Sequence, residues 1–348
     1  MRVLGIESSC DDTAAAVVED GPRIVSNVIH AQHDNHAPFG GVVPEIASRE
    51  HINRIIDIVG RAVGEAGGLK TLDGIAVTRG PGLIGSLLVG MQFAKGLALA
   101  TGLPWVGINH LEGHLCAALL AEEPVKYPHV ALVVSGGHSH LYLVRGFGDY
   151  QVLGGTRDDA AGEAFDKVSK LIGLGYPGGQ RIDEAAKGGD GNAVKLPRGM
   201  PSTKNFDFSF SGLKTAASQY VKSRGGNLPV DERADFCASL QEAIADILTK
   251  KAVAAARKYD AAGVVLAGGV AANSRLRELL AERCGRARLW SLIPPRELCT
   301  DNGAMIAAAG WMRLGAGERT AWRTSAVSRW RLGDQSAIGV RVKPWRQP

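Results

Sequence analysis

His110 and His114 are the two residues of this sequence whose type and spacing best suit the binding of a metal ion. On a helix, side chains four residues apart project from one face, so both imidazoles can reach a single divalent ion. A catalytic site needs a third protein ligand, often a carboxylate, and leaves the other positions to water or substrate. Asp301, which precedes a stretch of small residues that predicts a helix, is our candidate for that ligand, and capping of the helix is its alternative role.

The same spacing does not predict a zinc protease. In the HExxH motif of those enzymes, a glutamate directly follows the first histidine and acts as the general base, whereas Leu111 stands there in this sequence. Glu112 lies two positions after His110, which on a helix is about 200° around the axis and away from the ligand face. Taken alone, the histidine pair also fits an ordinary half-buried polar pair.

Composition indicates a globular chain without a membrane segment. The 348 residues, of which 45% are hydrophobic and 22% charged, are enough for two domains, each with its own core. We find no apolar run of 18 residues and no signal peptide, so neither the sequence nor its start predicts a membrane span. Five cysteines at scattered spacings without a CxxC motif favour reduced thiols and a cytoplasmic location.

The net charge of +5 comes entirely from residues 321–348, so residues 1–320 carry no net charge and predict no strong basic stripe. The same terminal segment holds Trp322, Trp330 and Trp345. Such a mixture of arginine and tryptophan suits contact with nucleic acid through phosphates and stacking. A solvated and poorly ordered tail is the alternative.

The first third of the chain predicts an α/β unit. Apolar runs at 2–6 and 14–18 flank the polar stretch 7–13, which predicts a hairpin whose loop either contacts phosphate or Mg²⁺ or is simply solvated. The further predicted elements are a helix at 46–63, a strand at 72–78, a glycine-rich turn at 79–86, a helix at 87–100 and a strand at 104–108. A loop contains three histidines, His30, His33 and His36, which we interpret as substrate contacts or exposed residues in preference to metal ligands.

The opening plan recurs further along the chain. A strand at 130–134, a small polar turn at 135–139 and a strand at 141–144 repeat the first hairpin. Two such copies predict a duplicated α/β domain that clasps a nucleotide. The backbone amides of Gly136 and Gly137 can form a nest for an anion, since no side chain blocks the approach.

Polar residues near other predicted turns are candidate nucleotide contacts. Capping of a helix at 158–167 explains Asp158 and Asp159 but not Asp166, which lies two turns in. Asp183 stands near the entry of the next helix. Asn273 follows a strand and a double glycine, where a purine could lie against bare backbone while the amide offers a donor and an acceptor.

Taken together, these stretches resemble one family, the tRNA N6-adenosine threonylcarbamoyltransferases of the bacterial TsaD type. The resemblance extends over residues 1 to about 310. The matching segments, in the family's order, are 5–13 (GIESSCDDT), 109–114 (NHLEGH), 133–138 (VVSGGH), 158–167 (DDAAGEAFDK), 176–179 (YPGG), 208–214 (FSFSGLK), 266–273 (LAGGVAAN) and 299–305 (CTDNGAM).

The resemblance implies a duplicated actin-like, sugar-kinase-like (ASKHA) α/β fold of two domains with a nucleotide cleft between them. We assign residues 1–127 to the first domain, with a returning helix at about 300–320, and residues 128–299 to the second, with a helical insertion. Residues 321–348 remain as a basic, tryptophan-containing and poorly ordered tail.

The implied reaction moves a threonylcarbamoyl group from threonylcarbamoyl-AMP to N6 of adenosine 37 in tRNAs that read ANN codons. By the same resemblance, His110, His114 and Asp301 would hold one Fe²⁺, with Zn²⁺ as the alternative. The adenylate site, which ATP or AMP would also occupy, would be lined by Val134, Ser135, Gly136, Gly137, His138, Asp166, Gly179, Asp183 and Asn273. No side-chain nucleophile is expected, because the carbamoyl group of the substrate is already activated.

The resemblance also implies partners. These are the tRNA itself, a smaller paralogous subunit that binds through the first domain, and a P-loop ATPase. Two other functions remain as alternatives: an ATP-binding scaffold of the same fold without chemistry, and a metalloendopeptidase.

Overall fold

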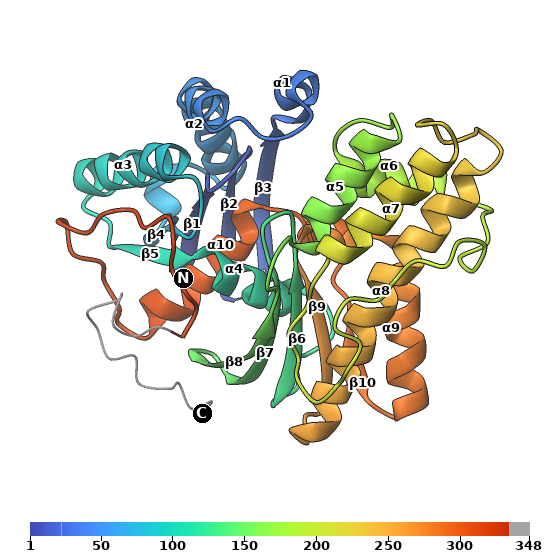
Figure 1. The fold of residues 1–348 in the computed structure, drawn as a ribbon. Coiled ribbons are helices and arrows are strands. Elements are labelled where there is room, and N and C mark those ends of the chain that lie inside the picture. The colour runs from blue at the N-terminus through green and yellow to red at the C-terminus, as the bar shows by residue number, and fades with distance from the viewer. Residues whose placement is uncertain (22, 334–348) are drawn as a thin grey trace. The chain divides into compact units, whose positions relative to one another are not determined.

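The computed structural model describes residues 1–21 and 23–333, which form two compact units (Figure 1). Unit 1 comprises Met1–Val125, Gly146–Asp149 and Asp301–Pro348, of which 334–348 lie outside the described residues. Unit 2 comprises Lys126–Arg145 and Tyr150–Thr300. The domain boundaries and the cleft inferred from the sequence stay predictions.

Unit 1 is built on a mixed sheet of five strands in the order β3-β2-β1-β4-β5. Its strands are β1 (Arg2–Glu7), β2 (Asp12–Glu19), β3 (Arg23–Ala31), β4 (Gly74–Gly80) and β5 (Trp105–Asn109). Strand β2 pairs antiparallel with β1 and β3, whereas β4 pairs parallel with β1 and β5. The carboxyl ends of β1, β4 and β5 therefore meet at one edge of the sheet.

Helices cover both faces of this sheet. Because successive strand residues point to opposite faces, Leu4 and Ile6 pack with α2 (Pro44–Glu65) and α3 (Ile84–Thr101), while Val3 packs with α10 (Gly303–Gly315). Helix α10 lies unusually close to the strands. A Cβ atom on Gly5 would come within 2.3 Å of the Gly303 oxygen, so only glycine fits at this crossing.

Unit 2 repeats the same plan with strand order β10-β9-β6-β7-β8. Its strands are β6 (His129–Val134), β7 (Ser139–Gly146), β8 (Asp149–Gly155), β9 (Gly263–Ala267) and β10 (Trp290–Leu292). Its helices are α5 (Ala161–Leu171), α6 (Gly178–Ala185), α7 (Ser211–Ser223), α8 (Arg233–Lys258) and α9 (Ser274–Ala287). As in unit 1, the first strand pairs antiparallel with the second and parallel with a later one. The predicted duplication is confirmed.

The remaining helical elements are short. They are α1 (His33–His36), α4 (His110–Cys116), η1 (Ala37–Phe39), η2 (Leu69–Thr71), η3 (Ala117–Leu120), η4 (Gly269–Ala272) and η5 (Arg296–Leu298). Among the described residues, α3 alone is long and apolar enough to cross a membrane by length and composition, with a mean hydropathy of 1.3. Core helices of soluble proteins can have the same length and apolar composition.

The capping roles predicted for Asp158 and Asp159 are both wrong, because no side chain of the described residues caps α5. Asp159 instead pairs with Lys167 and Lys214. Helix α5 begins only at Ala161, so Asp158 does not cap it. Its carboxylate instead accepts hydrogen bonds from the backbone N–H groups of Phe210 and Ser211, at 2.8 and 3.3 Å, and holds the start of α7. Burial raises the pKa of Asp158, but hydrogen bonds from the hydroxyls of Ser209 and Ser211 and from these two N–H groups outweigh it and lower the pKa.

The first part of the predicted tail packs against unit 1. The Trp330 side chain is only 6% exposed, and the Arg79 guanidinium lies 5.0 Å from its ring centroid. The N–H of Val327 donates to the Arg79 carbonyl, and Lys95 donates to the Thr324 carbonyl. Residues 321–333 are therefore an integral strap of unit 1, which differs from the poorly ordered segment expected from the sequence. The part of this prediction that concerns 334–348 lies outside the described residues.

Candidate functional site

The two histidines lie on a short helix at the carboxyl end of β5. Strand β5 ends at Asn109, whose side-chain oxygen accepts a hydrogen bond from the N–H of Leu111 and caps helix α4. Since His110 and His114 are one turn apart, their rings lie next to each other, edge to face, with centroids 4.7 Å apart and an interplanar angle of 78°. His110 is 5% exposed and His114 is fully buried. The predicted helical pair is confirmed.

Asp301 reaches the same point from the start of α10. Its Oδ1 atom lies 3.5 Å from Nε2 of His110 and 3.2 Å from Nε2 of His114. Asp301 does not cap the helix, because Asn302 fills that role by accepting a hydrogen bond from the N–H of Met305. The three side chains offer ligand atoms that all lie within 4.8 Å of one another.

These distances fit a shared metal ion. Two ligands each about 2.1 Å from a metal lie roughly 3.0 Å apart at a right angle and roughly 3.4 Å apart at the tetrahedral angle. Both ring nitrogens of His114 are buried and make no hydrogen bond among the described residues, although Nε2 lies 3.2 Å from Asp301 Oδ1; a metal bound at Nε2 would satisfy this buried atom. Two histidines and one carboxylate with open positions are typical of non-haem iron sites, and zinc accepts the same donors.

Glu7, which the sequence left in an undefined polar turn, orients His110. It ends β1, next to the carboxyl ends of β4 and β5, and its Oε2 lies 3.0 Å from Nδ1 of His110. The carboxylate also accepts hydrogen bonds from the Thr78 hydroxyl and from the N–H of Ser9. When Nδ1 carries the proton toward Glu7, Nε2 is free to bind a metal. No local sequence pattern identifies Glu7 as a partner of His110, because the contact depends on the order of the parallel strands.

The surrounding charge favours a cation at this point. Burial alone would lower the pKa of His110, but the carboxylates of Asp301 and Glu7 outweigh it and raise the pKa to about 9. Burial and the nearby acids, among them Asp11 and Asp301, raise the pKa of Asp12 well above its usual range. Several acidic groups thus gather around two imidazoles in a largely dry setting.

Glu112 is excluded as a base at this site. It is fully buried and forms a two-pronged ion pair with Arg313, with distances of 2.6 and 2.8 Å. The expectation that Glu112 points away from the ligand face is confirmed. The loop histidines are also separate: within the described residues, the one cluster with metal-ligand spacing is that of His110, His114 and Asp301.

In unit 2, the predicted nucleotide residues are linked into one ring of contacts. After Val134, the turn at 135–138 closes through hydrogen bonds between the backbone N–H of Ser135 and the His138 carbonyl, and between the His138 N–H and the Ser135 hydroxyl. Helix α5 lies directly behind this turn, since a Cβ on Gly162 would come within 2.6 Å of the Ser135 oxygen. Cβ atoms on Gly136 or Gly137 would meet nothing within 4 Å, so the outer side of the turn is open.

The ring continues through α6 and α9. Asp166 accepts a hydrogen bond from the N–H of Gly178 at 2.7 Å, which fixes the start of α6 beside Gly179. Asp183 accepts hydrogen bonds from the N–H and the hydroxyl of Ser274. The chain returns to the first turn at Gly268, where a Cβ would come within 2.3 Å of the Val134 oxygen.

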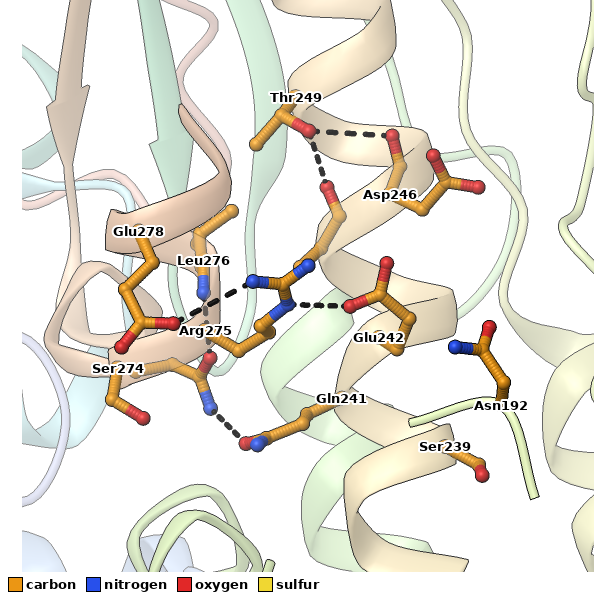
Figure 2. Close-up of polar contacts among 12 residues, drawn as sticks. Asn192, Ser239, Gln241, Glu242, Asp246, Thr249, Ser274, Arg275, Leu276 and Glu278 are labelled. Atoms are coloured by element: carbon orange, nitrogen blue, oxygen red, sulfur yellow. Dashed lines mark hydrogen bonds and ion pairs between the residues drawn. The ribbon is translucent and has the colours of Figure 1, made fainter. Parts of the chain in front are cut away.

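Asn273 is held more firmly than the sequence suggested. Its amide nitrogen donates to Asp183 and to Gln241, at 3.2 and 3.1 Å, and its oxygen accepts from the N–H of Leu276, which caps α9. Figure 2 shows Gln241 and Ser274 on either side of this network. Asn273 is therefore a fixed part of the ring, and its amide hydrogens already have protein partners.

Comparison with known proteins identifies close relatives over nearly the whole chain. The family model described as "TsaD: tRNA N6-adenosine threonylcarbamoyltransferase" matches residues 23–308. A protein of that name from Anaeromyxobacter dehalogenans (strain 2CP-C) is 56% identical over 95% of this chain and 99% of its own length. Another from Syntrophus aciditrophicus (strain SB) is 54% identical over 95% of this chain and 98% of its own length.

Two solved structures share the fold at low sequence identity. Component A of (R)-2-hydroxyglutaryl-CoA dehydratase from Acidaminococcus fermentans aligns with a TM-score of 0.55 and 16% identity over 90% of this chain and 99% of that one. HypF from T. kodakarensis aligns with a TM-score of 0.58 and 14% identity over 88% of this chain and 46% of that one. These likenesses support the actin-like, duplicated α/β fold and nothing finer.

Replacing both His110 and His114 by alanine should abolish stoichiometric metal binding while leaving the secondary structure intact. Glu7→Gln is the graded control, because it keeps all three ligands and removes only the charge behind His110, and it should weaken metal affinity roughly 10- to 100-fold. Elemental analysis of protein loaded with Fe²⁺ or Zn²⁺, together with circular dichroism, measures both effects. A double variant that retains one equivalent of metal would refute the ligand assignment.

Metal binding near neutral pH should release a proton from His110. With a pKa of about 9, this imidazole is protonated in the metal-free protein, and a metal at Nε2 must displace that proton. Apparent metal affinity should therefore rise with pH and level off above about 9. The pKa of His110 in the folded protein lies above the ordinary value of 6.5, so protonated His110 stabilises the metal-free fold through its ion pairs with Asp301 and Glu7. This stabilisation is fully present below pH 6.5 and is lost as the pH rises through about 9.

Titration calorimetry in buffers of different ionisation enthalpy measures the number of protons released. About one proton per metal ion is expected near neutrality, falling toward zero above the pKa of His110. Heats that do not depend on the buffer would contradict the protonated state of His110.

Proposed function

The chain belongs to the TsaD family of tRNA N6-adenosine threonylcarbamoyltransferases, and on that basis we propose that it transfers a threonylcarbamoyl group from threonylcarbamoyl-AMP to N6 of adenosine 37 in tRNAs that read ANN codons. The observation that carries the proposal is the convergence of His110, His114 and Asp301 in a chain 56% identical to a named member. Helix α4 supplies the histidines, and Asp301, two residues before the start of α10, supplies the carboxylate from a distant part of the sequence.

The chemistry asks for positioning and charge stabilisation. A carbamoyl group joined to a phosphate as a mixed anhydride is already activated, so no side chain has to attack it first. We propose that the three ligands hold one Fe²⁺, with Zn²⁺ as the alternative. A divalent ion there would act as a Lewis acid that offsets negative charge developing on the carbamoyl oxygen. Glu7 holds the His110 ring in the tautomer that exposes Nε2, and Thr78 and Ser9 hold Glu7.

We assign the adenylate site to the ring of residues in unit 2. Gly136 and Gly137 leave the outer side of the turn bare, so backbone N–H groups can approach a phosphate without a steric barrier. Asp166 and Asp183 are engaged by the starts of α6 and α9, so we propose that their role is to fix these helices around the nucleotide. ATP or AMP would occupy the same position as the adenylate.

A metalloendopeptidase is disfavoured by the ion pair of Glu112 with Arg313, which leaves no free glutamate on the histidine helix. A scaffold that only binds ATP is disfavoured by the three ligands with open coordination positions. We place the protein in the cytoplasm with its tRNA substrate.

We propose that a smaller paralogous subunit docks on α2 and α3. Large apolar side chains remain exposed there, including Ile56 at 72% and Leu99 at 75%. Packing against the sheet explains the apolar residues on the inner faces of α2 and α3. It does not explain the exposed apolar residues on their outer faces, which do not contribute to the core. A P-loop ATPase is proposed as a further partner, implied by the family resemblance.

A bulky side chain at Gly137 should block nucleotide binding without disturbing the fold. Gly137→Val places its side chain on the open side of the turn, where the added Cβ atom meets no atom within 4 Å beyond its chain neighbours. Gly146→Val, at the end of β7 and equally unobstructed, is the matched control. ATP affinity measured by calorimetry should fall at least tenfold for the first variant and stay unchanged for the second. Unchanged affinity at Gly137 would refute the placement.

The transfer reaction is tested by reconstitution. The full chain is incubated with threonylcarbamoyl-AMP and an ANN-decoding tRNA, with and without the paralogue and the ATPase, and the tRNA is digested to nucleosides for mass analysis. We expect multiple turnover only with the partners present. Absence of modified adenosine in every combination, with active partners, would refute the proposed function.

Ile56→Asp should abolish the stimulation by the paralogue, since it places a charge in the proposed apolar contact. Val230→Asp is the control, because Val230 is similarly exposed at 78% but lies in unit 2.

A further inference from the structure

Helices α8 and α9 of unit 2 pack side by side (Figure 1). Along the seam between them, acidic residues of α8 face basic residues of α9. Glu242 of α8 pairs with Arg275 of α9, as Figure 2 shows. One turn further along α8, Asp246 pairs with Arg283 of α9 and also with Arg198. Over these two turns, each arginine of α9 that faces the seam has a carboxylate on α8.

The pattern ends at Lys250. This residue lies one turn after Asp246, at the position where a third carboxylate would continue the series. A hollow of about 290 Å³ opens here, and Val253 and Ala254 are part of its apolar lining. Lys250, Arg257, Arg283 and Arg286 supply its charged lining, and no acidic residue lines it.

Two of these four cations are not balanced. Arg283 is matched by Asp246, and Arg286 is matched by Glu282. Within residues 1–21 and 23–333, no carboxylate lies within ion-pair distance of Lys250 or Arg257, and both side chains are exposed. The helix macrodipole accounts for Arg257 in the last turn of α8, but it does not account for Lys250 two turns earlier.

The hollow suits phosphates better than a free nucleotide. Its lining contains no aromatic ring on which a base could stack and no glycine turn against which a base could lie. Flexible lysine and arginine side chains on an open helix face are typical of contacts to a nucleic-acid backbone, which are independent of sequence.

The hollow also lies along the helix that reaches the predicted adenylate site. Gln241 of α8 accepts a hydrogen bond from Asn273 in the ring. At a rise of 1.5 Å per residue, Lys250 lies about 14 Å and Arg257 about 24 Å from Gln241 along the axis. A nucleic-acid strand carries one charge per roughly 3.4 Å of helix axis, so a substrate bound at the ring can extend several phosphates in this direction.

We propose that the hollow formed by Lys250, Arg257, Arg283 and Arg286 binds backbone phosphates of the tRNA substrate. The inference rests on the proposed function, because it names the surface of this chain on which that tRNA lies. Residues 1–320 have no net charge, and the sequence therefore predicted no strong basic stripe. In the folded chain, the unbalanced cations lie together at the end of the seam between α8 and α9. The net charge of the sequence does not reveal this cluster.

The test compares two double variants of the full chain. Lys250→Ala with Arg257→Ala removes both unbalanced charges at exposed helix positions, where alanine favours the helix. Lys70→Ala with Lys222→Ala removes two exposed lysines that lie outside the hollow and have no ion-pair partner among the described residues. Both variants change the net charge equally, so a non-specific charge effect appears in both.

The dissociation constant for an ANN-decoding tRNA is measured from about 50 to 200 mM salt. Loss of two phosphate contacts should reduce the slope of log affinity against log salt by about 1.4 to 1.8 for the hollow variant, and the control should keep the wild-type slope. A hollow variant with the wild-type slope, or a wild-type protein that binds no tRNA alone or with its partners, would overturn the proposal.

Two further measurements separate the possible causes. If inorganic phosphate or ATP binds more weakly to the hollow variant while its tRNA slope is unchanged, the hollow is a free-anion site and the proposal is wrong. In the reconstituted reaction, the hollow variant should show a raised KM for tRNA with kcat retained at saturation. Lack of modification by the wild type would instead count against the proposed function.

Discussion

The close approach of α10 to the central sheet of unit 1 is the constraint on which the candidate metal centre depends. Gly5 in β1 and Gly303 at the start of α10 have no side chains that would separate the helix from the strands. Gly310 allows the same close approach further along α10, where a Cβ would come within 2.2 Å of Ala76. Because the helix is fixed in this way, the residue before its cap is fixed too. Asp301, almost 200 residues after the histidines in the sequence, is thereby held at the end of α4.

The strand order supplies the second half of the arrangement. The parallel pairs β1–β4 and β4–β5 bring the carboxyl ends of three strands to one edge, so Glu7 at the end of β1 and His110 after β5 become neighbours. A buried carboxylate is unfavourable without partners, and the imidazole and the Thr78 hydroxyl provide them. The same contacts orient the ring. Stability of the sheet edge and orientation of a metal ligand thus come from one set of hydrogen bonds, which explains why a strongly polar group is tolerated in this core.

Sequence patterns predicted the parts of this arrangement that depend on local periodicity. The i, i+4 pair of His110 and His114, the repeated hairpins and the glycine turns all follow from short-range rules. Glu7 was missed as a partner of His110, because that contact depends on strand order, which hydrophobic alternation does not specify. Asp158 was assigned to the wrong helix for a related reason: a carboxylate near two helix starts fits either in sequence, and only the fold brings Phe210 to it.

The strap at 321–333 shows how such a long-range contact can reach the metal helix. Asn109 uses its oxygen to cap α4 and its amide nitrogen to donate to the Trp330 carbonyl, at 3.3 Å. The strap also lies close to the end of β4, because a Cβ on Gly80 would come within 1.9 Å of the Val327 oxygen. One amide side chain therefore joins the first turn of the histidine helix to the end of the described chain. A segment that composition presents as a solvated basic tail is, up to residue 333, part of the framework that holds His110 in place.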